Sequence, residues 1–155
     1  MLIDITLKIT PKMITDAQGN EKKALVGHLG THFDVMNKEF PLEYTRRKGV
    51  VFDVSEVTDR DIDVCDIDLD KVESDMFVSF YTGFIEKIGY GGKVYFTEHP
   101  QLSNELIDAL LDRGVFIIEK LCNLKAVLDN GGHFLANTYP MNYVEMTGLP
   151  CRVVV

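Results

Sequence analysis

The stretch His28-Leu29-Gly30-Thr31-His32-Phe33-Asp34 places two imidazoles and one carboxylate close together near the start of the chain. Residues two apart in an extended strand point to the same face, so a strand here would project His28, His32 and Asp34 together, with Gly30 leaving a gap between them. A helix would instead turn Asp34 about 200° away from His32, at ~100° per residue. The β-branched and aromatic side chains at positions 31 and 33 favour the strand.

Two imidazoles and a carboxylate form a suitable ligand set for zinc or a similar divalent ion. The alternative interpretation is two ordinary histidines and an aspartate at the mouth of a turn. Taken alone, the stretch does not decide between a metal site and a turn, so the rest of the chain has to.

The bulk composition describes a globular protein of one domain, residues 1–155, with 46% hydrophobic and 26% charged residues. The net charge of −8 argues against a nucleic acid or an anionic membrane surface as the partner. The N-terminus lacks the pattern of a signal peptide, and no apolar run approaches the ~20 residues of a membrane span. Cys65, Cys122 and Cys151 are odd in number and far apart, so we expect a reduced, cytoplasmic protein without a cysteine zinc site.

Strand and helix patterns interleave along the chain, which predicts an α/β fold. A helix is expected at Ser103–Arg113, with Ser103 as its N-cap and Gly114 ending it, and a shorter one at Asn123–Asp129. The acidic residues 58–75 indicate a solvated loop rather than a calcium loop, because Lys71 and Phe77 stand where glycine and glutamate are needed. Strands are expected at Leu2–Ile9, Gly49–Val54, Met76–Tyr81, Lys93–Thr97, Val115–Ile118 and, on both sides of a break at Pro140, within Phe134–Val155.

Several short sequence motifs, spread in order along the chain, add to the evidence from the stretch at 28–34. They are Leu2–Thr6, HLGTHFD at 28–34, Pro41–Glu43 with Val50–Ser55, Asp75–Gly83, His99–Ser103, Ile117–Leu124 and Gly148–Arg152. Together they resemble the cyclase family of metal-dependent hydrolases, whose best-known activity is that of bacterial kynurenine formamidase. The resemblance implies a single α/β domain of the swivelling β/β/α type, with a mixed sheet or small barrel and flanking helices.

The same resemblance implies roles for individual residues. His28, His32 and Asp34 would bind a divalent metal, zinc or alternatively manganese, with the aspartate bridging two ions in two-metal members. Glu119 would be a ligand of the second ion, complete the shell of the first, or take a proton from the attacking water. The alternative for Glu119 is a glutamate at a strand end in a salt bridge.

Two departures from the family pattern bear on activity. Lys38 stands where the family has a histidine proposed to shuttle protons. Lysine, with a reference pKa near ~10.4, is a poor base but could stabilise an oxyanion; the alternative is a solvated loop lysine. No histidine lies between His99 and Glu119, where the family has another ligand of the second ion. His99 and His133 are the substitutes available, although a turn or surface position is the ordinary role of His133.

Two functions therefore remain open. The first is a hydrolase that uses metal-activated water to cleave an amide, formamide or cyclic amide, in the manner of an arylformamidase. The second is a catalytically degenerate member that binds metal or a small molecule without turnover. In either case we expect a small-molecule ligand, and the resemblance implies a homo-oligomer, dimer or tetramer. Phe33, Met36, Phe40 and Tyr81 are candidates for the lining of a pocket, with core packing as the expected role of at least half of them.

Overall fold

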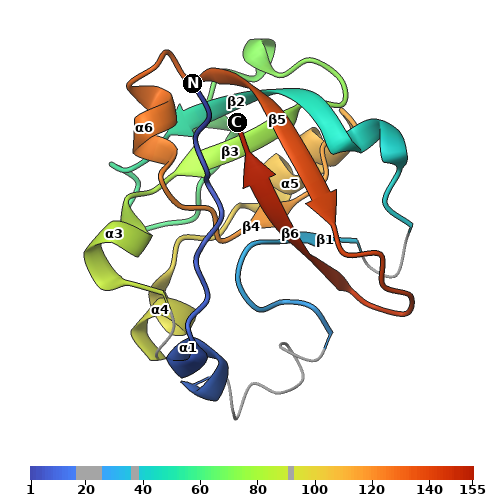
Figure 1. Cartoon of the computed structure of the whole chain (residues 1–155). Coiled ribbons are helices and arrows are strands. Elements are labelled where there is room, and N and C mark those ends of the chain that lie inside the picture. The colour runs from blue at the N-terminus through green and yellow to red at the C-terminus, as the bar shows by residue number, and fades with distance from the viewer. Residues whose placement is uncertain (17–25, 36–38, 91–92) are drawn as a thin grey trace.

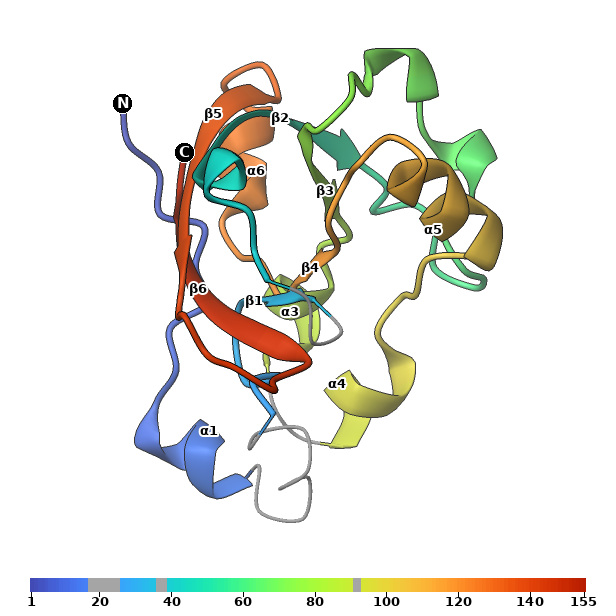
Figure 2. The ribbon, with the colours of Figure 1, turned by 90° about the vertical axis from the view of Figure 1, so that its right-hand side faces the viewer.

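A mixed six-stranded sheet, nearly closed and barrel-like, forms the centre of the molecule (Figures 1 and 2). The structure is a computed structural model that describes residues 1–16, 26–35, 39–90 and 93–155. The strand order is β3-β2-β5-β6-β1-β4, in which only the β2–β3 pair of these neighbours is parallel. The strands are β1 His32–Asp34, β2 Arg46–Asp53, β3 Phe77–Tyr81, β4 Ile118–Glu119, β5 His133–Pro140 and β6 Gly148–Val154.

Short helices surround this sheet. They are α1 Pro11–Asp16, α3 Phe84–Ile88, α4 Lys93–Glu98, α5 Asn104–Leu111 and α6 Leu124–Leu128, with 3₁₀ turns η1 Leu42–Thr45, η2 Val64–Asp66 and η3 Leu69–Lys71. Within the described residues, no helix has the length and apolar character needed to cross a membrane.

The strand β2 is buried on both faces, which explains its continuous apolar run. Val51 faces a core that also contains Phe33 and Phe77. Val50 and Phe52, which lie two positions apart on the opposite face of the strand, face a second core. The second core is covered by α5, whose Leu106 and Leu110 are almost fully buried. Figure 2 shows α5 on the side of β3 away from β5 and β6. The α/β fold class expected from the sequence is therefore confirmed.

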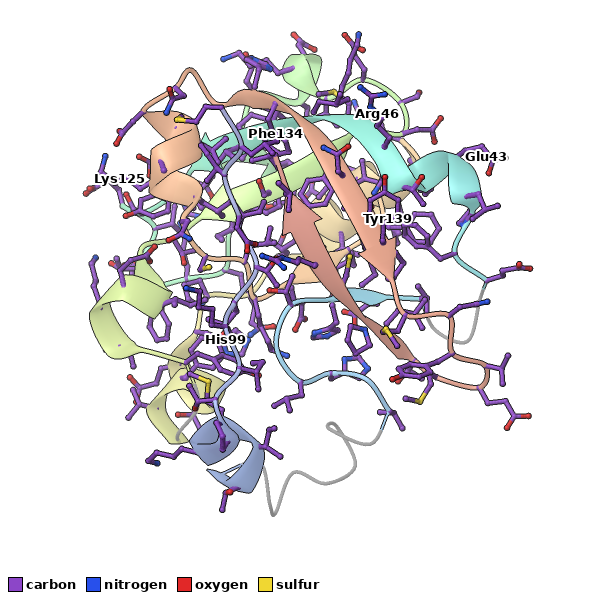
Figure 3. The ribbon with its side chains drawn as sticks, in the orientation of Figure 1. Glu43, Arg46, His99, Lys125, Phe134 and Tyr139 are labelled. Atoms are coloured by element: carbon purple, nitrogen blue, oxygen red, sulfur yellow. The ribbon has the colours of Figure 1, made fainter. Side chains whose placement is uncertain are left out.

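One close approach in the sheet requires glycine. The register of β2 on β5 places Gly49 opposite Phe134, which Figure 3 labels on β5. A Cβ atom at position 49 would overlap the ring of Phe134. Without it, that ring lies over the strand and packs edge-on against Phe77, with 5.7 Å between the ring centroids.

Three expected strands are corrected by the structure. The strand expected at Val115–Ile118 is limited to the short β4, which begins at Ile118 and ends at Glu119. Residues 93–98 form the helix α4 instead of a strand, because Tyr95 is buried against the rings of Tyr90 and Phe84, and this packing overrides the local strand propensity. The N-terminal segment Leu2–Ile9 is not a continuous strand. It pairs first with β6, through the bridge of Asp4 to Val154, and then with Leu121 through Thr6.

Candidate metal centre

The strand β1 lies between β6 and β4 and carries two of the three predicted ligands. His32 is opposite Pro150 on β6 and Glu119 on β4. His32 and Asp34, two residues apart, share one face as predicted. His28 is not part of the strand. It lies in the loop before the strand, where Gly30 adopts a φ of +70°, so the extended geometry expected for the whole stretch holds for residues 32–34 and is wrong for residues 28–31.

The three predicted ligand atoms converge. The Nδ1 atom of His28 lies 2.9 Å from Nε2 of His32 and 3.2 Å from Oδ1 of Asp34, and the latter two atoms are 3.4 Å apart. Ligands ~2.0–2.1 Å from a tetrahedral zinc ion lie about 3.3 Å from one another. The observed separations lie close to that value.

The hydrogen bonds of these three side chains indicate which of their atoms can act as ligands of a cation. The carbonyl oxygen of Gly30 lies 2.7 Å from Nδ1 of His32 and can only accept, so Nδ1 carries the proton and Nε2 is an acceptor. Without a metal ion, this Nε2 atom can accept from the Nδ1–H of His28, which lies 2.9 Å away. The hydroxyl of Thr147 lies 2.8 Å from Nε2 of His28 and accepts from it when Nδ1 serves as a ligand. The Oδ1 atom of Asp34 is buried and has no hydrogen-bond donor in the described part of the chain. When the proton of His28 is on Nε2, the three groups present three acceptor atoms to one another, and this arrangement fits a divalent ion.

Burial, followed by the neighbouring charge on His32, holds the pKa of His28 below its usual range. The imidazole is therefore kept in its neutral form, which is the form that binds metal. The side chain of His32 is completely buried, and that of Asp34 is 21% exposed. The side chain of His28 is 20% exposed, so solvent reaches both His28 and Asp34, whereas it does not reach His32.

The loop that carries His28 is held against β6 by two glycines. Gly27 adopts a φ of +94°, and a Cβ atom on it would overlap the carbonyl of Gly148. The backbone N–H of Gly148 donates to Val26 at 2.9 Å. Thr147, immediately before Gly148, thereby reaches His28. Sequence reasoning missed Thr147, because a lone threonine separated by 119 positions from its partner carries no signal of this role.

Glu119 lies beside the group without joining it. Its Oε2 atom is 3.8 Å from Nε2 of His32 and 3.3 Å from the ammonium of Lys120. The cluster of candidate metal ligands within the described residues consists of His28, His32 and Asp34. The salt-bridge interpretation of Glu119 matches its contact with Lys120, and its role as a metal ligand stays a prediction.

The other predicted residues have different positions. His99 follows α4, where Figure 3 labels it. Its Nδ1 atom contacts the carbonyl of Tyr95 at 2.8 Å, and its Nε2 atom contacts the amide of Gln101 at 2.6 Å. His133 is exposed on β5, opposite Val50 of β2. Lys38 lies outside the described residues.

A pocket of about 280 Å³ opens beside the centre. Its lining combines polar groups, among them Asp34, Glu119, Lys120 and His99, with a larger set of apolar and aromatic side chains: Ile62, Phe80, Phe84, Ile85, Tyr95, Leu102, Ile107, Ile117, Ile118 and Leu121. Of the four candidates for a pocket lining, the three that the structure describes do not line this pocket, and core packing is the role expected for at least half of the four. Phe33 and Phe40 pack on each other in the core, Tyr81 lines a separate small hollow, and Met36 is outside the described residues.

The fold is thus that of an α/β protein with a nearly closed mixed sheet, and its candidate metal centre combines His32 and Asp34 of the inner strand β1 with His28 of the loop before it. The family model Cyclase, described as "Putative cyclase", matches residues 3–119. Since this match spans most of the chain, the protein belongs to the Cyclase family. A search of curated proteins finds no match.

Solved structures share the fold. A "potential metal-dependent hydrolase with cyclase activity" is 21% identical with a TM-score of 0.71, over 99% of this chain and 96% of that one. Isatin hydrolase A from Labrenzia aggregata, bound to benzyl benzoate, is 16% identical with a TM-score of 0.69, over 99% and 92%. A "predicted metal-dependent hydrolase" from Bacillus stearothermophilus is 19% identical with a TM-score of 0.61, over 99% and 97%.

Proposed function

We propose that this protein is a metal-dependent hydrolase that cleaves the C–N bond of a small amide, formamide or cyclic amide. The observation that carries the proposal is the convergence of three acceptor atoms, within 3.4 Å of one another, next to a pocket. His28, His32 and Asp34 would hold the ion, with zinc and manganese as the candidates. A divalent ion bound there would supply Lewis acidity, by lowering the pKa of water and polarising a carbonyl group.

The pocket supports a small substrate with an apolar body. Its volume of about 280 Å³ is close to the lower end of the ~300–1,000 Å³ typical of small-molecule sites. The rings of Phe80, Phe84 and Tyr95 contribute to its lining, so a planar aromatic amide or lactam matches it in shape and polarity. The burial of Tyr95 raises the pKa of its hydroxyl, which stays neutral and protonated.

Glu119 is the residue that we assign to proton transfer. Asp34 and Glu119 are the two carboxylates in the lining of the pocket. In the proposed reaction the Glu119 carboxylate takes a proton from the attacking water as its oxygen bonds to the carbonyl carbon. The same proton then passes to the leaving nitrogen as the C–N bond breaks. The 40% exposed side chain of Glu119 can reach a substrate in the pocket, whereas the buried His32 cannot.

A second candidate is a family member that binds metal or a small molecule without turnover. The observation in its favour is that both ring nitrogens of His99, the histidine nearest to the pocket, are engaged by Tyr95 and Gln101. His99 would therefore have to break both contacts before it could replace the missing family ligand of the second ion.

The expected homo-oligomer also stays a proposal. Apolar side chains are exposed along β5 and the turn that follows it, with Tyr139, labelled in Figure 3, 68% exposed and Val144 84% exposed. Light scattering coupled to size-exclusion chromatography would measure the mass directly. A monomer at all concentrations would contradict the proposal.

The test of the proposed function combines a metal count with an activity assay. We expect bound zinc or manganese by mass spectrometry, and chelator-sensitive hydrolysis of at least one member of a panel of aryl formamides and cyclic amides. Asp34→Asn should weaken metal binding by about 100-fold or more, because the charged ligand is lost. Asp59→Asn, an exposed aspartate outside the pocket, serves as the control.

The outcomes separate the two candidates. Metal bound without turnover across the panel would favour the degenerate member. Failure of the wild-type protein to bind zinc or manganese under any loading condition would refute both metal-based functions. Equal metal affinity in Asp34→Asn and wild type would refute the assignment of Asp34.

A further inference from the structure

The side chain of Lys120 is built into the edge of the candidate metal centre. It is only 7% exposed, and its ammonium donates to the carbonyl oxygen of His28 at 2.9 Å. The same ammonium lies 3.3 Å from Oε2 of Glu119. A positive charge is therefore fixed between the backbone of one candidate ligand and the neighbouring carboxylate.

Lys120 reaches this position beside Glu119 because its backbone has a positive φ angle. Consecutive residues of a strand point to opposite faces, so Lys120 should point away from Glu119. Its φ of +61° is uncommon for a residue other than glycine and interrupts this alternation. The hydroxyl of Thr31 donates to the carbonyl of Lys120 at 2.6 Å, so the segments around His28 and Lys120 are tied in both directions. Such conformations cluster where function requires them.

The charges around the centre follow from these contacts. Asp34 and Glu119 supply two negative charges, which one divalent ion would balance, and Lys120 already lies against one of them. A second divalent ion would add positive charge beside an ammonium that is largely shielded from solvent, where repulsion between like charges is strong. Glu119 would then have to exchange its lysine partner for that ion.

We propose that the Lys120 ammonium takes the place of a second divalent ion beside Glu119, so that this centre binds one ion per chain. Lys120 is in this sense a positioning residue. It holds Glu119 in the pocket and sets the stoichiometry of the centre. The inference rests on the proposed metal centre and goes beyond it, because His28, His32 and Asp34 by themselves do not decide whether a second ion binds beside Glu119.

The experiment titrates zinc and manganese, each alone, into metal-free protein, and measures affinity by calorimetry and stoichiometry by mass spectrometry. Wild type should saturate at one ion per chain. Lys120→Gln should bind that ion about tenfold more tightly or accept a second one, because a neighbouring positive charge is removed. Lys125→Gln is the matched control, since Lys125 on α6, labelled in Figure 3, also pairs with a carboxylate, at 2.9 Å from Asp129, but does not line the pocket.

A second variant keeps the test decisive if Lys120→Gln does not fold. Glu119→Gln should still bind one ion per chain, with affinity reduced by about tenfold or less, because the carboxylate is paired to lysine rather than to the ion. Two ions in wild type, unchanged affinity and stoichiometry in a folded Lys120→Gln, or loss of the ion in Glu119→Gln would each overturn the inference. Absence of any ion from wild type would instead refute the proposed metal centre itself.

Discussion

The hydroxyl of Thr147 lies 2.8 Å from Nε2 of His28, on the opposite side of the imidazole from the nitrogen that faces His32 and Asp34. The contact joins the loop before β1 to the residue that precedes β6. It therefore orients the ligand that the strand itself does not position. A partner of this kind fixes both the tautomer and the angle of a metal-binding ring.

Replacing Thr147 with valine should weaken metal binding by about 10- to 100-fold while the fold is retained. Valine has nearly the shape of threonine but cannot accept the proton of Nε2, so the His28 ring loses its orientation. Calorimetric titration of zinc into the metal-free variant measures the change. Thr58→Val, an exposed threonine, is the control, and an affinity equal to that of wild type in Thr147→Val would contradict the proposed role.

The contact of Gly27 with Gly148 gives a prediction about stability. Gly27 and Gly131 have similar φ values of +94° and +98°, but an added Cβ atom would overlap Gly148 in the first case and meet nothing within 4 Å in the second. Gly131→Ala should cost about 1–2 kcal/mol of unfolding free energy through the left-handed backbone alone. Gly27→Ala should cost more and also weaken metal binding, since the His28 loop must move away from β6. Urea unfolding of both variants gives the comparison, and equal losses would show that the Gly148 contact is not tight.

The sequence was sufficient where side-chain period and local chemistry determine the structure. The apolar run of β2, the N-cap of α5 at Ser103 and the shared face of His32 and Asp34 all depend on residues close together in the chain. The local sequence of α4 favours a strand, whereas the helix depends on the burial of Tyr95 against the rings of Phe84 and Tyr90, which other segments supply.

The supporting contacts of the site could not be read from the sequence for a related reason. Thr147 and His28 are 119 positions apart, and Lys120 and His28 are 92 positions apart. A threonine or lysine at such a position has no distinctive spacing. Its role follows only from the pairing of β1 with both β6 and β4.

The N-cap of α5 offers a test of how the pocket wall is held. The Ser103 hydroxyl accepts from the backbone N–H of Leu106 at 3.1 Å and donates to Asp63 at 2.7 Å. Ser103→Ala should lower the free energy of unfolding by about 1–2 kcal/mol, because one cap and one link to the acidic loop are both lost. Denaturant unfolding measures the loss, with the exposed Ser74→Ala as the control. A loss no larger than that of the control would show that the cap does not stabilise α5.

The ion pair of Arg60 and Asp66 in the acidic loop should make the free energy of unfolding depend on pH in the acid range. The guanidinium of Arg60 contacts both carboxylate oxygens of Asp66 at 2.6 Å and, together with the backbone N–H of Asp63, lowers the pKa of Asp66 to about 2 from its ordinary 3.8. The unfolded chain therefore binds a proton at higher pH than the folded chain does. The stabilisation from Asp66 is complete above the ordinary pKa and disappears as the pH falls to about 2.

Asp66→Asn should accordingly be less stable than wild type near neutral pH, and the difference between the two proteins should shrink as the pH is lowered through this range. The urea midpoints of both proteins, measured from about pH 6 down to about pH 2.5, provide the test. Asp59→Asn, which removes a neighbouring exposed carboxylate, corrects for the change in net charge. A constant difference between Asp66→Asn and wild type over this range would mean that the Arg60 pair does not shift the titration of Asp66, and that the loop is held by its backbone contacts alone.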